Sequence, residues 1–342
     1  MPLVSVIVPN YNHAPYLRQR LDSIFNQTFQ DFEVIILDDC STDNSKEIIE
    51  EYRNRPQVSH VVYNETNSGS PFKQWAKGFD LAQGEYIWIA ESDDWAELNF
   101  LEVLISILNK NSSLVFAFCE SYWEYPQITV PGKALKKSSI YNGIDYIKNK
   151  QIYYNSIVNA SSVVFRKHVL ANTANDYQFF NGSGDYLFWS LLCEQGYIYY
   201  TTNILNHFRR PPANTTSRCM ATGITFIENF SIYKYFKQKG YISKFANYRI
   251  IEHSLSEIEQ YSEVLGKNHC YSKCKTIWEN ERVETNSTSF FLSFCANQIN
   301  RCDSLPLYAK LWQFLHLPDT NIRGHLPFYK RNQQKWNSRS SP

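Results

Sequence analysis

Short apolar runs alternate with amphipathic stretches along the first 120 residues of the chain. The runs are rich in Val and Ile and are followed by polar residues or Pro, which is typical of buried β-strands. The predicted strands are 4–8, 34–37, 58–63 and 86–90. The stretches between them repeat apolar side chains at helical spacing, and the predicted helices are 15–26, 46–52 and 72–82. This alternation predicts crossover units and an α/β fold with a largely parallel sheet flanked by helices.

The pattern changes in the second half of the chain. A strand at 162–165 and a helix at 185–195 continue the mixed character. After residue 217 the apolar spacing predicts longer helices, at 226–238 and 244–261. We therefore expect an α/β domain over residues 1–217 and a mainly helical C-terminal extension over residues 218–342, which a chain of 342 residues can accommodate.

Polar clusters stand where three of the predicted strands end. They are Pro9-Asn10-Tyr11-Asn12, the segment 38–43 and Glu91-Ser92-Asp93-Asp94. In parallel sheets, ligands bind beyond the carboxyl ends of the strands. The sequence therefore predicts one binding site built from all three clusters.

Composition narrows the class of ligand. Lys and Arg number 34 against 33 Asp and Glu, a net charge of +1 that argues against a nucleic-acid partner. Aromatic residues make up 16% of the chain, a surplus that suits flat or half-polar substrates but also serves packing. No apolar run approaches 18 residues and the N-terminus lacks a secretory signal, so we expect a cytoplasmic protein with reduced cysteines.

Common nucleotide and hydrolase motifs are missing from the sequence. There is no Gly-x-Gly-x-x-Gly, P-loop, His-Glu-x-x-His or Gly-x-Ser-x-Gly segment. The remaining chemistry is acidic. Glu91 and Asp93 are two residues apart, which would place them on one face of an extended segment. Such oxygen ligands suit Mg²⁺ or Mn²⁺ shared with a phosphate, although a solvated acidic turn is the simpler alternative.

Taken together, the motifs resemble glycosyltransferase family 2, the inverting enzymes with a GT-A fold that build bacterial surface glycans. The resemblance covers about residues 3–217. It is carried by the opening strand through Asn12, by Asp38-Asp39-Cys40-Ser41-Thr42-Asp43 and by the segment 84–94. It implies transfer of a sugar from a nucleotide-diphosphate sugar to a hydroxyl of a glycan or lipid-linked saccharide.

The resemblance also implies a role for each matching position. Asp93 would be the principal ligand of Mn²⁺ or Mg²⁺, and Glu91 would reach the metal through water. His207 remains a further candidate for the metal or the diphosphate. Asp185 would be the general base that deprotonates the acceptor hydroxyl. The implied nucleotide-sugar residues are Pro9, Tyr11, Asn12, Asp38, Asp39, Lys73, Glu91 and Ser92.

Three departures from the family pattern keep alternatives open. Glu91 stands where Asp is usual, Gly184 replaces a Glu before the base, and Arg209-Arg210-Pro211 lacks a histidine at its third position. A non-catalytic nucleotide-sugar binding protein, a decayed transferase, would show such losses. A sugar-phosphate nucleotidyltransferase is a second alternative, but it would need a Gly-rich loop with Arg after the first strand.

Two further features of the sequence lie in the C-terminal third: its cysteines and its basic tail. His269-Cys270, Cys274, Cys295 and Cys302 are spaced poorly for structural zinc, so we expect unligated thiols. The segment 305–317 is apolar and aromatic, and the tail after Asp319 carries only basic charges. This combination fits either peripheral contact with an anionic membrane surface, on the inner face of the cell membrane, or a docked helix with a solvated end.

Overall fold

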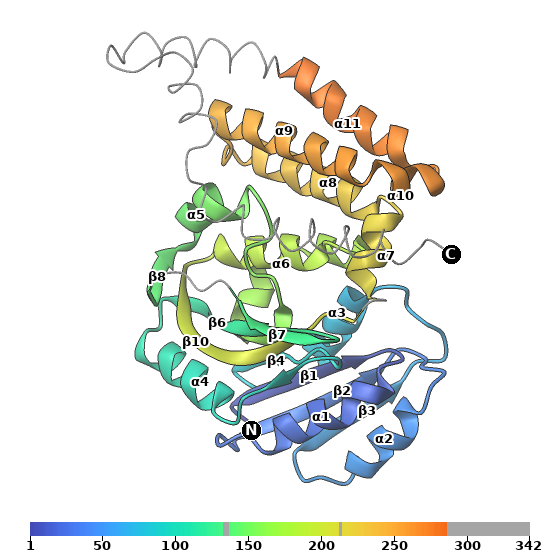
Figure 1. Ribbon diagram of the computed structural model, residues 1–342. Coiled ribbons are helices and arrows are strands. Elements are labelled where there is room, and N and C mark those ends of the chain that lie inside the picture. Colours follow the sequence, from blue (N-terminus) through green and yellow to red (C-terminus); the bar gives the residue numbers. More distant parts are fainter. Residues whose placement is uncertain (133–136, 212–213, 286–342) are drawn as a thin grey trace. The chain divides into compact units, whose positions relative to one another are not determined.

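A computed structural model describes residues 1–132, 137–211 and 214–285 (Figure 1). The chain divides into two units, and the first of them, Met1–Asn280, holds the whole sheet and the predicted site. The second unit, Glu281–Pro342, falls almost entirely outside the described residues, and with it the predicted basic tail.

The first half of the sheet is parallel, as expected from the alternating pattern. It runs in the order β3-β2-β1-β4, so β1 lies in the interior of the sheet. The register aligns Asn10 with Asp38, which brings the ends of two polar clusters side by side. The strands are β1 (Val4–Asn10), β2 (Phe32–Asp38), β3 (Val58–Tyr63) and β4 (Tyr86–Ile89).

The second half of the sheet is mixed. β9 is antiparallel to both β4 and β6, whereas β10 is parallel to β6. Three short strands pair antiparallel with these: β5 and β8 with β10, and β7 with β6. The bounds are β5 (Trp95–Ala96), β6 (Leu114–Tyr125), β7 (Ile128–Pro131), β8 (Ser139–Asn142), β9 (Val163–Arg166) and β10 (Tyr197–Arg209).

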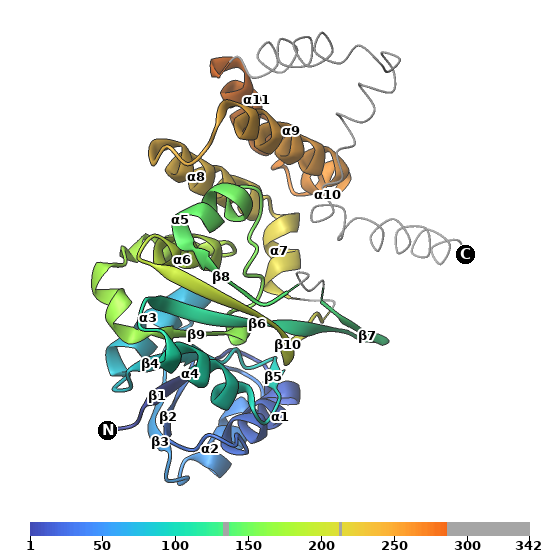
Figure 2. The ribbon, with the colours of Figure 1, turned by 90° about the vertical axis from the view of Figure 1, so that its left-hand side faces the viewer.

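Helices cover both faces of the sheet (Figure 2). Val4, Val6 and Val8 point to one face, where they pack with α1 (Ala14–Phe25), α2 (Ser45–Tyr52) and α4 (Phe100–Lys110). Ile7 points to the other face, which is covered by α3 (Pro71–Leu81) and α6 (Gly184–Cys193). This alternation along one strand follows from the period of two of the β-pleat, and burial on both faces explains the continuous apolar runs.

The later helices join the same core as α3 and α6. α6 lies between the sheet and α8 in both views, and the ring of Phe236 on α8 lies 5.9 Å from that of Tyr186 on α6. The predicted domain boundary at residue 217 stays a prediction. The remaining helices are α5 (Gly143–Tyr146), α7 (Thr215–Ala221), α8 (Ile224–Gln238), α9 (Lys244–Gln260), α10 (Ser262–Lys267) and α11 (Tyr271–Glu284). Among residues 1–132, 137–211 and 214–285, no helix has the length and apolar character needed to span a membrane.

The cysteines of the described chain are free thiols. Cys274 is buried, and its Sγ lies 3.6 Å from the carbonyl oxygen of Gly223. Across the described ranges, no group of three or more His, Cys, Asp or Glu side chains is placed to hold a metal ion. Cys295 and Cys302 lie outside those ranges, as does the aromatic segment 305–317.

Candidate active site

The loops after β1 and β2 are joined by buried polar side chains. Asn10 Nδ2 donates to Asp38 Oδ1 at 2.8 Å, and the Ser41 hydroxyl donates to the same oxygen at 2.6 Å. The Ser41 oxygen in turn accepts the backbone N–H of Asn12 at 2.9 Å. Asn12 and Cys40 both have positive φ, 55° and 64°. The carboxylate of Asp38 therefore holds two strained loops in register, and its bonds stay within them.

Asp39 organises a different loop. Its carboxylate accepts hydrogen bonds from Asn64 Nδ2 at 2.6 Å and from the backbone N–H of Ser68 at 2.9 Å. Gln74, on α3, donates to it at 3.0 Å. Only 5% of Asp39 is exposed. The loop 67–71 is thus fixed to Asp39, and Lys73 folds back onto it through a 2.9 Å bond from Nζ to the carbonyl oxygen of Ser68.

The acidic cluster after β4 forms a turn, so the predicted extended geometry is wrong. The N–H of Asp94 donates to the carbonyl oxygen of Glu91 at 3.1 Å, which closes the turn. Asp94 is buried and accepts hydrogen bonds from Asn159 Nδ2 at 2.8 Å, Ser161 Oγ at 2.7 Å and the Arg209 N–H at 3.0 Å. Asp94 therefore ties the turn to the segment before β9 and to the end of β10.

Glu91 faces away from this anchor. Its Oε1 accepts a 2.8 Å hydrogen bond from Trp75 Nε1, on α3. Burial raises the pKa of Glu91 to about 8, and the charge of Asp93 adds to the shift. In the ordinary range of pH, the site therefore resists carrying all its negative charges unless a cation is present.

Asp93 is the free carboxylate of the turn. Among the described residues, no other residue donates a hydrogen bond to its side chain, although its carbonyl oxygen accepts from Arg209 at 2.8 Å. Burial raises the pKa of Asp93, while the charges of Arg20 and Arg209 lower it. A carboxylate with unused lone pairs, next to two buried or half-buried cations, is placed to bind an added ligand.

Arg20 is the cation that sequence reasoning missed. It lies on α1, is fully buried, donates from Nε to the carbonyl oxygen of Glu91 at 2.8 Å and lies 5.3 Å from the ring centre of Trp88. Its two terminal nitrogens have no hydrogen-bond partner in the described chain. The signal for it was small: an Arg on the apolar face of a predicted helix, among Leu17, Leu21 and Ile24.

Asp185 lies in the first turn of α6, at the start of a helix as predicted for the candidate base. Asn155 Nδ2 donates to Oδ2 at 2.8 Å, and the N–H of Tyr186 donates to Oδ1 at 2.8 Å. Burial raises the pKa of Asp185 to about 7 despite these hydrogen bonds. A Cβ on the preceding Gly184 would lie 2.5 Å from the ring of Phe72, so packing excludes the Glu that is usual in the family at this position.

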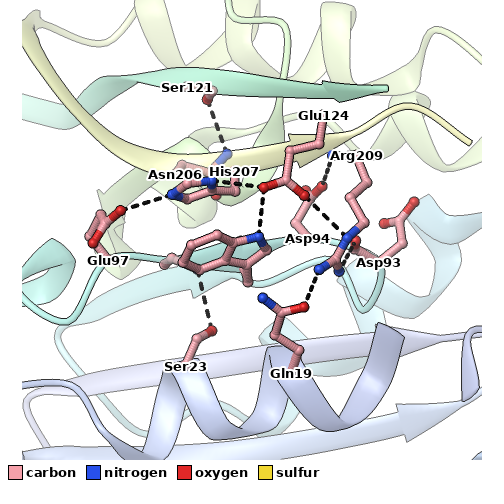
Figure 3. A network of polar contacts seen from close by, with 12 residues as sticks. Gln19, Ser23, Asp93, Asp94, Glu97, Ser121, Glu124, Asn206, His207 and Arg209 are labelled. Carbon is pink, nitrogen blue, oxygen red and sulfur yellow. Dashed lines mark hydrogen bonds and ion pairs between the residues drawn. The ribbon is translucent and has the colours of Figure 1, made fainter. Parts of the chain in front are cut away.

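His207 is enclosed by carboxylates (Figure 3). Its Nδ1 lies 2.9 Å from Glu124 Oε1 and its Nε2 lies 2.8 Å from Glu97 Oε1. The imidazole stacks on Trp95 with ring centres 3.4 Å apart. Both ring nitrogens are therefore engaged, and this geometry favours a role in positioning the β10 end that carries Arg209. The metal-ligand prediction for His207 stays a prediction.

The remaining predicted residues line the same edge of the sheet. Pro9 is buried within β1, and Tyr11 follows that strand with 43% of its surface exposed. Ser92 is buried and pairs with His13, with 2.8 Å between Oγ and Nδ1. Ser70 Oγ donates to the carbonyl oxygen of Phe180 at 2.8 Å and thereby connects the Asp39 loop to the segment before Asp185.

The donor set fits a divalent cation of the kind the fold family implies. Mg²⁺ is usually held by one or two carboxylates together with substrate phosphates, so a site with one free carboxylate meets the requirement. Asp93 supplies that carboxylate, and Glu91 lies near enough for the charge of Asp93 to raise its pKa. The residues present therefore fit the group.

Comparisons with known proteins agree with this geometry. Residues 5–169 match the family "Glycosyl transferase family 2". Poly(ribitol-phosphate) beta-N-acetylglucosaminyltransferase TarS of Staphylococcus aureus is 38% identical over 111 residues, which is 32% of this chain and 19% of that protein. GalNAc(5)-diNAcBac-PP-undecaprenol beta-1,3-glucosyltransferase of Campylobacter jejuni is 25% identical over 295 residues, which is 85% of this chain and 92% of that protein.

The fold is also shared with a solved structure. The crystal structure of S. aureus TarS 1–349 in complex with UDP-GlcNAc matches with a TM-score of 0.54 and 22% identity, over 79% of this chain and 72% of that one. This likeness confirms the α/β, GT-A type of fold. Relatives that share 33–38% identity are covered over only 19–56% of their own length. Residues 5–169 of this chain thus match the model of glycosyl transferase family 2, and the fold is shared with that solved structure.

Proposed function

We propose that the chain is an inverting glycosyltransferase that moves a sugar from a nucleotide-diphosphate sugar to a saccharide hydroxyl. One observation carries the proposal. Two carboxylates stand in contrasting environments: the carboxylate of Asp93 accepts no hydrogen bond from another described residue, whereas that of Asp185 is held by Asn155 and has its pKa raised to about 7. Two carboxylates of one site can take different chemical roles when their surroundings differ in this way.

The donor we propose first is a UDP-sugar. A TarS structure contains UDP-GlcNAc, and the loops that would receive such a nucleotide are pre-formed here by Asp38 and Asp39. Tyr11, half exposed beside these loops, offers a ring face for stacking on the base. The proposed nucleotide-sugar residues are Pro9, Tyr11, Asn12, Asp38, Asp39, Lys73, Glu91 and Ser92.

We assign the divalent cation to Asp93, with Glu91 reaching it through water. When bound, Mn²⁺ or Mg²⁺ would neutralise the diphosphate that departs with the nucleoside. The chain's own contribution is positional: Asp94 fixes the turn that presents Asp93, through its bonds to Asn159, Ser161 and the Arg209 N–H. The guanidinium of Arg209 is held beside the turn by the carbonyl oxygen of Asp93 and by Gln19.

Asp185 serves as the general base in this proposal. A carboxylate with a pKa of about 7 is available as a base near neutral pH and takes up a proton readily. The acceptor oxygen forms the new bond to the anomeric carbon as its proton passes to Asp185. The bond from that carbon to the diphosphate oxygen breaks on the opposite face, so the configuration inverts.

The acceptor we propose is a bacterial surface polymer or a lipid-linked saccharide. The names of the relatives specify poly(ribitol phosphate) in one case and an undecaprenol-linked saccharide in the other. Peripheral contact with a membrane, through the basic tail, remains part of this proposal. A non-catalytic binding protein is the alternative, and turnover decides between the two.

The deciding experiment combines donor binding with turnover. Thermal shifts are measured with UDP-, GDP- and dTDP-sugars, with and without Mn²⁺, on the wild type, Asp93→Ala and Asp185→Asn. Ligand binding to the native state raises the midpoint. We expect one nucleotide class to give a Mn²⁺-dependent rise that Asp93→Ala loses and Asp185→Asn keeps. Release of UDP with water as acceptor should fall by about 10²–10⁴-fold in Asp185→Asn. Donor binding with no turnover in wild type across acceptors would favour the decayed transferase.

A further inference from the structure

A carboxylate on α8 holds the segment that leads into the candidate base. Glu228 Oε1 accepts the N–H of Asn181 at 2.6 Å, and Oε2 accepts the N–H groups of Gly182 at 2.9 Å and Ser183 at 2.7 Å. Three consecutive backbone donors thus converge on one charged group. Such a concave set of N–H groups is an anion-binding arrangement, and hydrogen bonds to a charged acceptor are roughly twice as strong as neutral ones.

The same segment has little other polar support at the start of α6. Ser183 is the N-cap residue of α6, and its side chain makes no capping hydrogen bond. Asp185 follows two residues later, in the first turn. The conformation of residues 181–183 therefore sets where the carboxylate of Asp185 lies, and Glu228 is the side chain that binds all three of their N–H groups.

Packing closes the segment from two further sides. A Cβ on Gly182 would lie 2.8 Å from Cys219 Cβ on α7, and a Cβ on Gly184 would lie 2.5 Å from the ring of Phe72 on α3. Neither glycine can be replaced without displacing a neighbour. The segment is thus packed between α3 and α7 while Glu228 binds its backbone. We therefore expect a change at Glu228 to alter the position of the Asp185 carboxylate.

The carboxylates of Glu228 and Asp185 are linked by their charges as well as by geometry. Burial is the main cause of the raised pKa of Asp185, and the negative charge of Glu228 adds to it. Asn155 is the side chain that donates to Asp185 from the neighbouring loop. On α7, burial raises the pKa of the Cys219 thiol, the charge of Glu228 adds to that shift, and Arg218 lowers it. Removing the charge of Glu228 should therefore lower the pKa of Asp185.

We propose that Glu228 is a positioning residue for catalysis, which fixes the 181–183 segment and thereby sets the placement of Asp185. The inference rests on the proposed function of Asp185 as the base. It assigns to α8, in the helical part of the chain after residue 217, a part in positioning the active site. The chain would then need these helices for turnover and not only for stability.

The first test needs no ligand. Hydrogen exchange is measured on peptides that span residues 181–186 in wild type, Glu228→Ala and Glu228→Gln. Glu263→Gln is the control, since Glu263 is exposed and pairs with Lys267 on its own helix. We expect exchange in this segment to quicken by roughly fivefold or more in Glu228→Ala, less in Glu228→Gln, which keeps one acceptor oxygen, and not in the control. Unchanged protection in both Glu228 variants overturns the proposal.

The second test reads the proton affinity of Asp185. Melting temperatures of wild type and Asp185→Asn are compared from pH 5 to pH 8.5, and the comparison is repeated in the Glu228→Gln background. The advantage of Asn over Asp at high pH should shrink without the charge of Glu228, because Asp185 then ionises more easily. An equal advantage in both backgrounds counts against the inference, whether or not Glu228→Ala folds.

Turnover separates this inference from the proposed function. With the donor found by thermal shift, Glu228→Ala should lower kcat for UDP release by up to about 10²-fold with little change in donor KM. In Glu228→Gln, the acid limb of the pH profile of kcat/KM should move to lower pH. Full activity of Asp185→Asn would overturn the role of Asp185 as the base, and with it this inference, while the transferase function stood. If Glu228→Gln keeps the wild-type pH profile and Asp185→Asn is inactive, only the proposed role of Glu228 is overturned.

Discussion

The indole Nε1 of Trp75 donates a 2.8 Å hydrogen bond to Oε1 of Glu91. This bond joins α3, on one face of the sheet, to the acidic turn at the end of β4. Trp75 is almost fully buried, and its ring contacts those of Phe188 and Trp189 on α6. One side chain therefore connects the helix that starts with the candidate base to the turn that carries the candidate metal ligand.

A double-mutant cycle measures this link. We expect Trp75→Phe and Glu91→Leu, separately and together, to show a coupling of about 1 kcal/mol or more in the free energy of unfolding, because each single variant leaves the other polar group buried without its partner. Urea denaturation at pH 7.5 gives the four values. The cavity left by the smaller ring cancels in the cycle, so a coupling indistinguishable from zero would mean that the bond contributes nothing.

Asp93 and Asp94 should respond oppositely to the same substitution. Asp94→Asn exchanges one acceptor oxygen for an amide that faces the donors Asn159, Ser161 and the Arg209 N–H, so we expect a loss of about 1–3 kcal/mol in stability. Asp93→Asn breaks no hydrogen bond from another described residue and removes a charge from a crowded site, so stability should hold or rise.

Urea denaturation measures the stability of both variants, and the donor thermal shift with and without Mn²⁺ measures their metal dependence. Asp93→Asn should lose the metal-dependent donor shift while remaining well folded. If the two variants proved equally destabilised, the distinction between an anchoring and a ligand-binding carboxylate would be mistaken.

The stability that Asp185→Asn gains over wild type should depend on pH. The pKa of Asp185 is raised to about 7, so between about pH 4 and pH 7 the folded protein binds a proton that the unfolded chain has released. Stability contributed by this group is therefore lost as pH rises through that window. Asn carries no such penalty. Its melting temperature should exceed that of wild type by a few degrees at pH 8, with the gap narrowing toward pH 5.

Scanning calorimetry across that range checks the sign directly. A gap that widened as pH fell would show that Asp185 is stabilised in its charged form, contrary to the burial seen here.

His207→Phe distinguishes a positioning role from metal binding. Phe keeps the stacking on Trp95 but leaves Glu97 and Glu124 without the imidazole, so we expect a loss of about 1–2 kcal/mol in stability. The Mn²⁺ dependence of the donor thermal shift should survive. Glu97→Gln, which keeps an acceptor for Nε2, is the matched control. If a folded His207→Phe protein lost the metal dependence, the result would instead support His207 as a metal ligand.

Much of the fold follows from local pattern. The predicted strands and helices of the first 82 residues each lie within two residues of the observed limits, because period and apolar runs report burial directly. The long strands β6 and β10 were not predicted: β6 opens with an apolar run like those of the predicted strands, whereas β10 mixes polar and aromatic residues along its length. The acidic turn was misjudged as extended because a two-residue spacing cannot tell a strand from a turn.

Sequence alone located Asp38, Asp39 and Asp93 at the ends of strands and Asp185 at the start of a helix. Only the tertiary structure separated their roles. Asp94 was marked as an anchor by donors 65 to 115 residues away, and Glu228 by backbone groups 45 to 47 residues away. The physical reason is that a carboxylate's role is set by which donors and charges surround it, and those come from segments that local pattern leaves unpaired.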